Sequence, residues 1–196
     1  MIEQSEIKSI LEDYDQLKLR IGMTASHSAL DLCDGAIEEG FPTVAYCQKG
    51  RERIYSEYFR TQRSSSGRVR RGMVDKTVVL DRFDGILNSE FQQGMRDRNM
   101  IFIPNRAFTS YCGIDRIENE FRVPMFGTRS MLRMEERTEE FDYYWLLEKA
   151  GLPYPEAIED PQDIDCLVIV KLHHAQKKLE RGFFTCASYE EYVEKS

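Results

Sequence analysis

The fold is set by residues 19–47, which read LRIGMTASHSALDLCDGAIEEGFPTVAYC. Residues 19–24 and 43–47 are nearly continuous apolar runs, as in strands that are buried on both faces. Between the two runs, apolar residues from Ala29 onward recur with the spacing of one helix face. Gly40 then follows, a residue that tolerates the positive φ of a helix C-terminus. Strand, helix and strand in close succession predict a βαβ crossover with two parallel strands.

The same alternation continues along the chain. We expect a leading helix at 6–14, strands at 78–80 and 100–104, a helix at 89–96 and a short strand at 123–127. Pro124 favours the edge or the end of a sheet for the last of these strands. Alternating strands and helices predict an α/β fold, with a Rossmann-like parallel-sheet domain over residues 1–127.

The pattern changes after Gly127. Residues 130–150 predict one helix, and 167–171 with 182–186 predict an antiparallel hairpin whose joining loop is charged. Ser188 is a candidate N-cap for a last short helix. We therefore expect residues 128–196 to form the first, incomplete part of an α+β domain.

Composition narrows the class of protein. The chain has 196 residues, of which 41% are hydrophobic and 31% charged, and its net charge is -7. It contains no apolar run of the ~20 residues that span a bilayer and no secretory signal, so we expect a cytoplasmic protein without a membrane partner. The acidic balance argues against nucleic acid as a partner. Five scattered cysteines without a C-x-x-C pair indicate reduced thiols.

Two loops after predicted strands carry candidate ligand-binding groups. Ser26, His27 and Ser28 follow the first strand, and Asn105 and Arg106 follow the strand at 100–104. Ligands of open α/β sheets bind at the carboxyl ends of strands, and amides at a helix N-terminus suit a phosphate. Helix capping by the serines and an exposed arginine in an ordinary loop remain the alternatives.

A second set of candidates lies in the later part of the chain. Arg129 and Arg133 are four residues apart, so on a helix they would face one anion or a set of glutamates. Lys171 ends a buried strand and is placed to meet a nucleotide phosphate. The basic loop that follows it suits triphosphate oxygens, or is an ordinary charged hairpin. His173 and His174 are adjacent and would point to opposite faces of a strand, so we expect no metal site in this chain.

Residues 60–71 form a basic segment around Ser64-Ser65-Ser66-Gly67 and predict a flexible loop. An acidic partner, RNA, a neighbouring subunit and a substrate phosphate all remain open as its contact. The sequence likewise leaves a homo-oligomer open.

A set of motifs, in this order, resembles one family. The motifs are Thr24-Ala25-Ser26-His27-Ser28-Ala29-Leu30, Asp34-Gly35-Ala36, Glu39-Gly40-Phe41, Lys49-Gly50-Arg51, Ile103-Pro104-Asn105-Arg106, Glu118-Asn119, Val123-Pro124-Met125-Phe126-Gly127, Leu146-Leu147-Glu148-Lys149-Ala150-Gly151 and Val168-Ile169-Val170-Lys171. The family is the archaeal formate-dependent 5-formaminoimidazole-4-carboxamide ribonucleotide synthetases, also called PurP, of the ATP-grasp superfamily. The resemblance covers nearly the whole chain.

The resemblance implies a purine-biosynthesis ligase. The family reaction is formylation of 5-aminoimidazole-4-carboxamide ribonucleotide by ATP and formate through formyl phosphate. The implied fold is a preATP-grasp Rossmann-like domain followed by the first ATP-grasp subdomain. The implied cofactors are ATP and Mg²⁺, and the resemblance places the magnesium ligands on a C-terminal half beyond this chain.

The resemblance also implies roles for single residues. His27 matches the substrate-binding histidine of the family, and Ala107 stands where the family has a second, serine contact. Lys171 matches the ATP-grasp lysine. Substrate contacts are therefore expected at Ser26, His27, Ser28, Asn105, Arg106 and Ala107, and ATP contacts at Lys171, Arg133, Lys177, Lys178 and Arg181.

Two departures from the family keep other functions open. Ala107 lacks the serine hydroxyl, and the loop after Lys171 is rich in lysine where the family often has glycine. The alternatives are a divergent carboxylate-amine ligase that acts on another substrate, and a non-catalytic nucleotide-binding module. The catalytic residues are not identified by the sequence.

Overall fold

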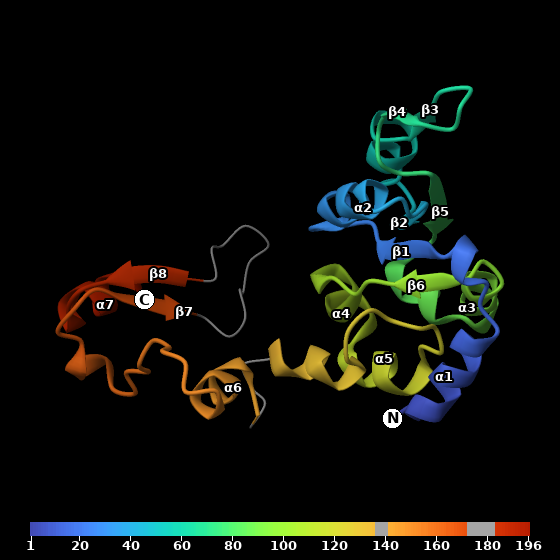
Figure 1. Cartoon of the computed structure of the whole chain (residues 1–196). Coiled ribbons are helices and arrows are strands. Elements are labelled where there is room, and N and C mark those ends of the chain that lie inside the picture. Colours follow the sequence, from blue (N-terminus) through green and yellow to red (C-terminus); the bar gives the residue numbers. More distant parts are fainter. Residues whose placement is uncertain (136–140, 172–182) are drawn as a thin grey trace. The chain divides into compact units, whose positions relative to one another are not determined.

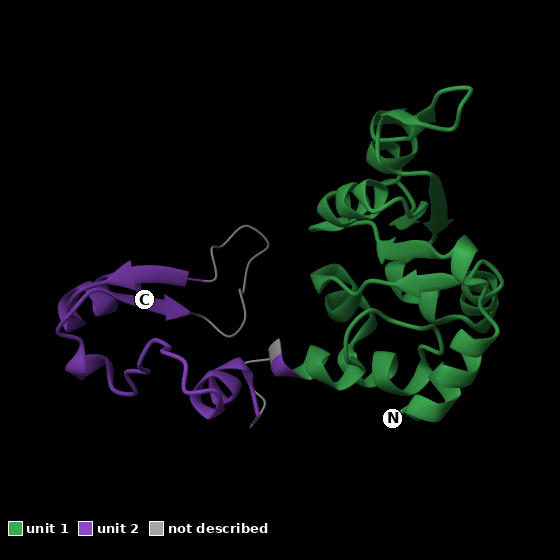
Figure 2. Ribbon diagram, viewed as in Figure 1, with its two compact units in different colours: residues 1–133 green, residues 134–196 purple. Residues whose placement is uncertain are grey.

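The structure, a computed structural model, describes residues 1–135, 141–171 and 183–196. Contacts within the chain divide it into two compact units, Met1–Arg133 and Met134–Ser196 (Figure 2). The domain boundary expected near residue 127 stays a prediction. No helix of the described residues is both long and apolar enough to cross a membrane.

Unit 1 is built on a four-stranded sheet in the order β5-β2-β1-β6, in which every strand pair is parallel (Figure 1). The strands are β1 (Arg20–Thr24), β2 (Thr43–Gln48), β5 (Lys76–Leu80) and β6 (Met100–Phe102). Helix α2 (Ala29–Glu38) joins β1 to β2, which confirms the predicted βαβ crossover. Gly40 follows α2 with a φ of 85°, as expected of a residue that ends a helix.

The two faces of the sheet carry separate apolar clusters, because alternate residues of a strand point to opposite sides. Ala45 and Cys47 belong to the cluster that α2 covers. Val44 and Tyr46 belong to the other cluster, with residues of helices that follow β5 and β6. These helices are the 3-10 helix η3 (Phe83–Leu87), α3 (Ser89–Arg96), α4 (Arg106–Cys112) and α5 (Ile114–Glu120). Helices α2 and α4 therefore cover opposite faces of the sheet.

Two short elements precede the sheet, α1 (Gln4–Glu12) and the 3-10 helix η1 (Gln16–Lys18). Helix α1 confirms the leading helix that the sequence predicts at 6–14, with both ends two residues earlier. Tyr14 lies between them, is buried, and donates its hydroxyl to the carbonyl of Met100 at 3.1 Å. This bond holds the N-terminal segment against β6.

The basic segment after β2 is a small antiparallel hairpin and not the featureless loop that its composition predicts. The π-helix η2 (Ile54–Tyr58) leads into β3 (Gln62–Arg63), which pairs with β4 (Val69–Arg71). Arg63 donates two hydrogen bonds to Asp75 Oδ1, at 2.7 and 3.2 Å, and the backbone N–H of Thr43 donates to the other oxygen at 3.0 Å. The hairpin is thus tied to the start of β2 by a partly buried ion pair.

Two predicted elements were wrong, and one helical region was missed. Residues 130–150 are not one helix: the 3-10 helix η4 (Arg129–Glu135) is followed, after residues outside the described part, by α6 (Tyr143–Lys149). Asp142 starts α6 anew, because its side chain accepts the N–H of Trp145. The strand at 123–127 is reduced to one parallel bridge between Phe102 and Met125. Residues 106–120 are helical although no helix was expected there.

Unit 2 contains α6, the 3-10 helix η5 (Pro161–Asp163), β7 (Val168–Lys171), β8 (Phe183–Cys186) and α7 (Tyr189–Lys195). Strands β7 and β8 pair antiparallel, which confirms the predicted hairpin. The predicted cap of the last helix is also confirmed, since Ser188 Oγ accepts the N–H of Glu191 at 3.3 Å. The charged loop expected between the two strands falls outside the described residues.

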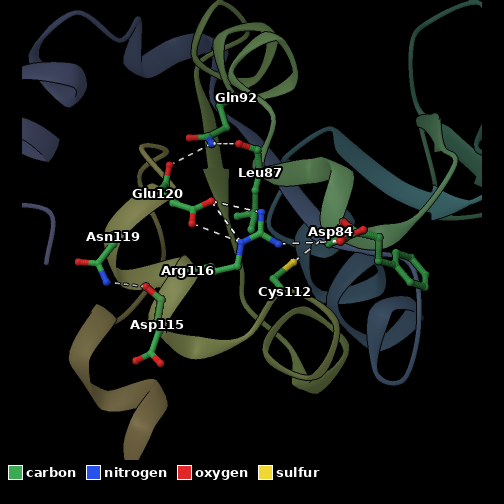
Figure 3. Close-up of polar contacts among 9 residues, drawn as sticks. Asp84, Leu87, Gln92, Cys112, Asp115, Arg116, Asn119 and Glu120 are labelled. Atoms are coloured by element: carbon green, nitrogen blue, oxygen red, sulfur yellow. Dashed lines mark hydrogen bonds and ion pairs between the residues drawn. The ribbon is translucent and has the colours of Figure 1, made fainter.

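A buried glutamine joins the helices that cover one face of the sheet (Figure 3). Gln92 of α3 donates from Nε2 to the carbonyls of Leu87 and Glu120, at 2.6 and 3.0 Å. Its Oε1 accepts the N–H of Arg122 at 2.6 Å. Only 4% of Gln92 is exposed. One side chain therefore satisfies backbone groups of η3, of the end of α5 and of the segment after it, which water reaches poorly.

We predict that Gln92→Leu destabilises the protein by about 2 kcal/mol, because two carbonyls and one N–H lose their partner inside the protein. Chemical denaturation followed by circular dichroism measures the effect. The matched control is Gln93→Leu on the exposed side of the same helix, which we expect to change the free energy of unfolding by less than ~0.5 kcal/mol. Equal effects of the two substitutions would contradict the role given to Gln92.

Candidate functional site

The candidate site lies where β1 and β6 end side by side. Since all four strands are parallel, their carboxyl ends share one edge of the sheet. The chain leaves β1 toward β2 on one side, and β6 pairs on the other side of β1. The helices after these two strands cover opposite faces, so the two loops diverge and leave a topological switch point between them. Open α/β sheets bind their ligands at such a point.

The loop after β1 carries Ser26, His27 and Ser28. His27 has a φ of 51°, a left-handed conformation that is strained for a residue other than glycine, and its side chain is exposed. The Ser26 carbonyl accepts the N–H of Ala29 at 3.1 Å, and the Ser28 carbonyl accepts the N–H of Leu32 at 3.0 Å. The Ser28 side chain makes no capping bond to α2, which weakens the reading of this serine as a helix cap.

The loop after β6 is joined to the first loop by Asn105. The Asn105 amide donates from Nδ2 to the carbonyls of Thr24 and Ser26, at 2.8 and 3.1 Å. Its Oδ1 accepts the N–H of Phe108 at 3.2 Å and so caps α4. The structure thus brings together the two groups of residues that the sequence singled out as substrate contacts.

The two residues after Asn105 differ in exposure. Arg106 is exposed and belongs to the first turn of α4. Ala107 is fully buried in the same turn. A serine hydroxyl at position 107, which the resemblance leads one to expect, would therefore lie at a buried position of this structure.

Sequence reasoning singled out Lys49 and Arg51 only as part of a motif, and the structure places them at the same edge of the sheet. Both follow β2, and both are exposed. The guanidinium of Arg51 donates to the hydroxyl of Tyr111 at 3.4 Å, and the Tyr111 ring packs 4.7 Å from that of Phe83, centroid to centroid. The sequence could have indicated this placement, because Lys49 and Arg51 follow closely after the predicted strand at 43–47.

The arginines of η4 stand against α5. Arg129 donates to the carbonyls of Ile117 and Val123, and its burial lowers the pKa of the guanidinium. Arg133 lies 2.6 Å from Asp115 and 2.7 Å from the buried carboxylate of Glu118. These contacts fix η4 on unit 1. Glu118 is common to both arginines, because its charge also acts on the Arg129 guanidinium. The ATP contact expected of Arg133 stays a prediction.

Lys171 ends β7 in unit 2, as predicted, and it is exposed. The strand itself is not buried as expected, since Ile169 is exposed and its neighbours are only partly buried. Its ammonium donates to the hydroxyl of Tyr144 at 3.3 Å and lies 6.0 Å from the centre of that ring. Lys149 stands in a similar relation to Trp145, at 5.8 Å. Lys177, Lys178 and Arg181, the other expected ATP contacts, lie outside the described residues, as do His173 and His174.

The thiols of unit 1 are inert. Burial raises the pKa of Cys33, Cys47 and Cys112 to about 12 each, so these groups stay protonated at neutral pH and are poor nucleophiles. Of the two cysteines in unit 2, Cys186 is buried and Cys166 is exposed. No three His, Cys, Asp or Glu side chains within residues 1–135, 141–171 and 183–196 gather into a group that would hold a metal ion.

A family model described as "Protein of unknown function (DUF1246)" matches residues 21–158. The chain belongs to this family. Two archaeal relatives, from Methanopyrus kandleri and Methanocaldococcus jannaschii, are each named 5-formaminoimidazole-4-carboxamide-1-(beta)-D-ribofuranosyl 5'-monophosphate synthetase. They are 40% and 39% identical over 197 residues, which cover 100% of this chain and 50% of each relative. The resemblance predicted from the motifs is thereby confirmed.

A solved structure is similar as well. The crystal structure of an IMP biosynthesis protein PurP from Thermococcus kodakaraensis matches with a TM-score of 0.55 and 27% sequence identity. The match covers 84% of this chain and 48% of that chain. It confirms the predicted α/β fold class for the DUF1246 chain. The chain spans about half the length of the curated relatives and of the solved structure that it matches.

Proposed function

We propose that the protein binds a ribonucleotide at the switch point of unit 1 and serves an ATP-dependent purine-biosynthesis ligase. The reaction is formylation of 5-aminoimidazole-4-carboxamide ribonucleotide by ATP and formate. The observation that carries the proposal is the juxtaposition of the 26–28 loop with Asn105 and Arg106, in a chain whose relatives carry a ribofuranosyl 5'-monophosphate in their name.

The arrangement suits a phosphorylated sugar. The hydroxyl of Ser28 lies at the start of α2 and makes no capping hydrogen bond to the helix. Helix α2 has ten residues, and its first N–H groups carry partial positive charge. His27 and Arg106 add exposed groups that can donate to phosphate oxygens. These groups come from the two loops that Asn105 joins, so one small anion would meet both loops.

Chemistry requires that formate be activated before it meets an amine. Phosphoryl transfer from ATP to formate gives formyl phosphate and ADP, and the amine of the ribonucleotide then displaces phosphate from the formyl carbon. Such a sequence depends on holding the reactants together. Lys171 fits the ATP part of this proposal, as an exposed cation at the end of a strand. We place the carboxylate and amide ligands for Mg²⁺ outside the described residues, and we assign no role in metal binding to the residues described here.

The test of the proposed function is titration of the chain with 5-aminoimidazole-4-carboxamide ribonucleotide in a calorimeter, followed by an assay of ADP release by the full-length natural protein with ATP, Mg²⁺ and formate. Saturable binding of the ribonucleotide supports the proposed site. Absence of both binding and ADP release would refute the proposal. Binding without ADP release would favour a nucleotide-binding module.

A divergent ligase is the second candidate, and Ala107 favours it, because the residue expected to contact the substrate through a hydroxyl is a buried alanine. ADP release that depends on a different carboxylate or amine, measured with a panel of small acids and amines, would support this candidate.

We predict that His27→Gly weakens ribonucleotide binding by about tenfold or more, because a hydrogen bond to a charged group is worth roughly 1.5–3 kcal/mol. Glycine accepts the left-handed backbone without strain, so stability should change by less than ~1 kcal/mol. Calorimetry and chemical denaturation measure the two effects.

The control for His27→Gly is Asn99→Gly. Asn99 has a φ of 52° and precedes β6, at the opposite end of the sheet. This substitution should leave the affinity for the ribonucleotide unchanged. Equal losses of affinity in the two variants would show that the effect is not specific to the imidazole of His27.

We predict that Lys171→Met lowers the affinity for ATP by about tenfold, as expected on loss of one charge-assisted contact to a phosphate. The matched control is Lys149→Met, since this lysine is also exposed and also lies over an aromatic ring of α6. Fluorescence titration with ATP separates the two. An unchanged affinity in Lys171→Met would remove Lys171 from the ATP site.

A further inference from the structure

All hydrogen-bonding groups of the Asn105 side chain have partners within the protein. Both hydrogens of its amide are directed at backbone carbonyls, those of Thr24 and Ser26, and its oxygen accepts the N–H of Phe108. Only 8% of Asn105 is exposed. A contact from its N–H groups to a ligand would break these bonds, so the role expected for Asn105 from the sequence, direct grip of a phosphate, does not agree with its geometry.

The bonds of Asn105 act on the backbone of His27. The Ser26 carbonyl belongs to the peptide group that precedes His27, and it accepts from both Asn105 Nδ2 and the N–H of Ala29. The Ser28 carbonyl is held in turn by the first turn of α2. His27 is therefore placed between fixed backbone groups, and its left-handed φ of 51° persists because its neighbours are held.

We propose that Asn105 is a positioning residue, whose side-chain amide holds the 24–28 loop in the conformation that presents His27 to the ligand of the switch point. The inference rests on the proposed function for the identity of that ligand. It assigns to Asn105 the placing of His27 and leaves contact with the ligand to the exposed side chains of the loop.

Asparagine is suited to this role because it is short and combines two donors with an acceptor. Aspartate has the same size and can still cap α4 through its oxygens, but it has no N–H to donate. In Asn105→Asp a carboxylate would face the carbonyl oxygens of Thr24 and Ser26 in a buried place, which is unfavourable. This substitution removes the link to the loop and keeps the helix cap, so it separates the two functions of the side chain.

The test uses the full chain and four variants: Asn105→Asp, His27→Gly, the double variant, and Gln92→Leu as a control. Gln92→Leu destabilises unit 1 away from the loop, so it reports what general destabilisation does to binding. We expect Asn105→Asp to weaken ribonucleotide binding by about tenfold or more. We expect the double variant to bind no more weakly than His27→Gly, because a residue that acts through the imidazole has no effect once the imidazole is gone.

Two results would overturn the inference. Asn105→Asp could bind the ribonucleotide as the wild type does. Alternatively, its loss could add in full to that of His27→Gly, as it would if Asn105 touched the ligand or if aspartate repelled the phosphate directly. A loss of the same size in Gln92→Leu would also count against the inference, since it would trace the effect to stability.

Nuclear magnetic resonance distinguishes failure of the inference from failure of the proposed function. The backbone chemical shifts of Ser26, His27 and Ser28 report their dihedral angles without any ligand. We expect these shifts to change in Asn105→Asp and to stay in place in Gln92→Leu. If the wild type does not bind the ribonucleotide, the proposed function fails, and unchanged shifts in Asn105→Asp would then overturn the positioning role as well.

Discussion

Unit 1 depends on the pairing of β1 with a parallel strand on each side. The pairing with β6 is close, because a Cβ on Gly22 would lie 2.3 Å from the sulfur of Met100. A larger side chain would have to displace the buried side chain of Met100, so glycine at position 22 favours the packing of β1 on β6 in this register. The register in turn decides which loop residues meet. With β6 in this place, Asn105 reaches the backbone of the next loop, and the two halves of the candidate site come together.

Two kinds of contact stabilise this sheet and the helices on it. Apolar clusters on both faces supply the burial, while a few polar side chains satisfy backbone groups that the helices leave unpaired. Gln92 does this between η3 and α5, and Asn105 does it between two loops. Arg129 does it where η4 meets the end of α5. Each of these side chains joins segments that are separated along the chain. These bonds fix the positions of the helices on the sheet.

Much of the fold followed from the sequence, because buried parallel strands and an amphipathic helix leave strong periodic signals. The βαβ crossover, the helix at 89–96, the β7–β8 hairpin and the cap at Ser188 were all read correctly. Helices α4 and α5 were missed since each has only seven residues and Gly113, with a φ of 78°, separates them. The long helix at 130–150 was wrong because its charge pattern does not show that Arg129 and Arg133 bind α5 or that Asp142 starts a new helix.

The candidate site was predictable in place but not in detail. That the loops after two parallel strands meet at one edge follows from topology, and so the sequence could group His27 with Asn105. Burial of Ala107 and the bonds of Asn105 depend on how α4 packs, which periodicity does not encode. The positive φ of His27 is also a tertiary property, since Asn105 and α2 impose it on a residue that does not prefer it.

The distribution of the thiols has a practical consequence for handling the protein. Four of the five cysteines are shielded from solvent, and Cys166 alone is exposed. Air oxidation of a stored sample will therefore join molecules through Cys166 in unit 2. Such a disulfide-linked dimer would elute from a size-exclusion column like a natural dimer, and a reducing agent would convert it to the monomer. The same residue offers one attachment point in unit 2 for a dye or a spin label.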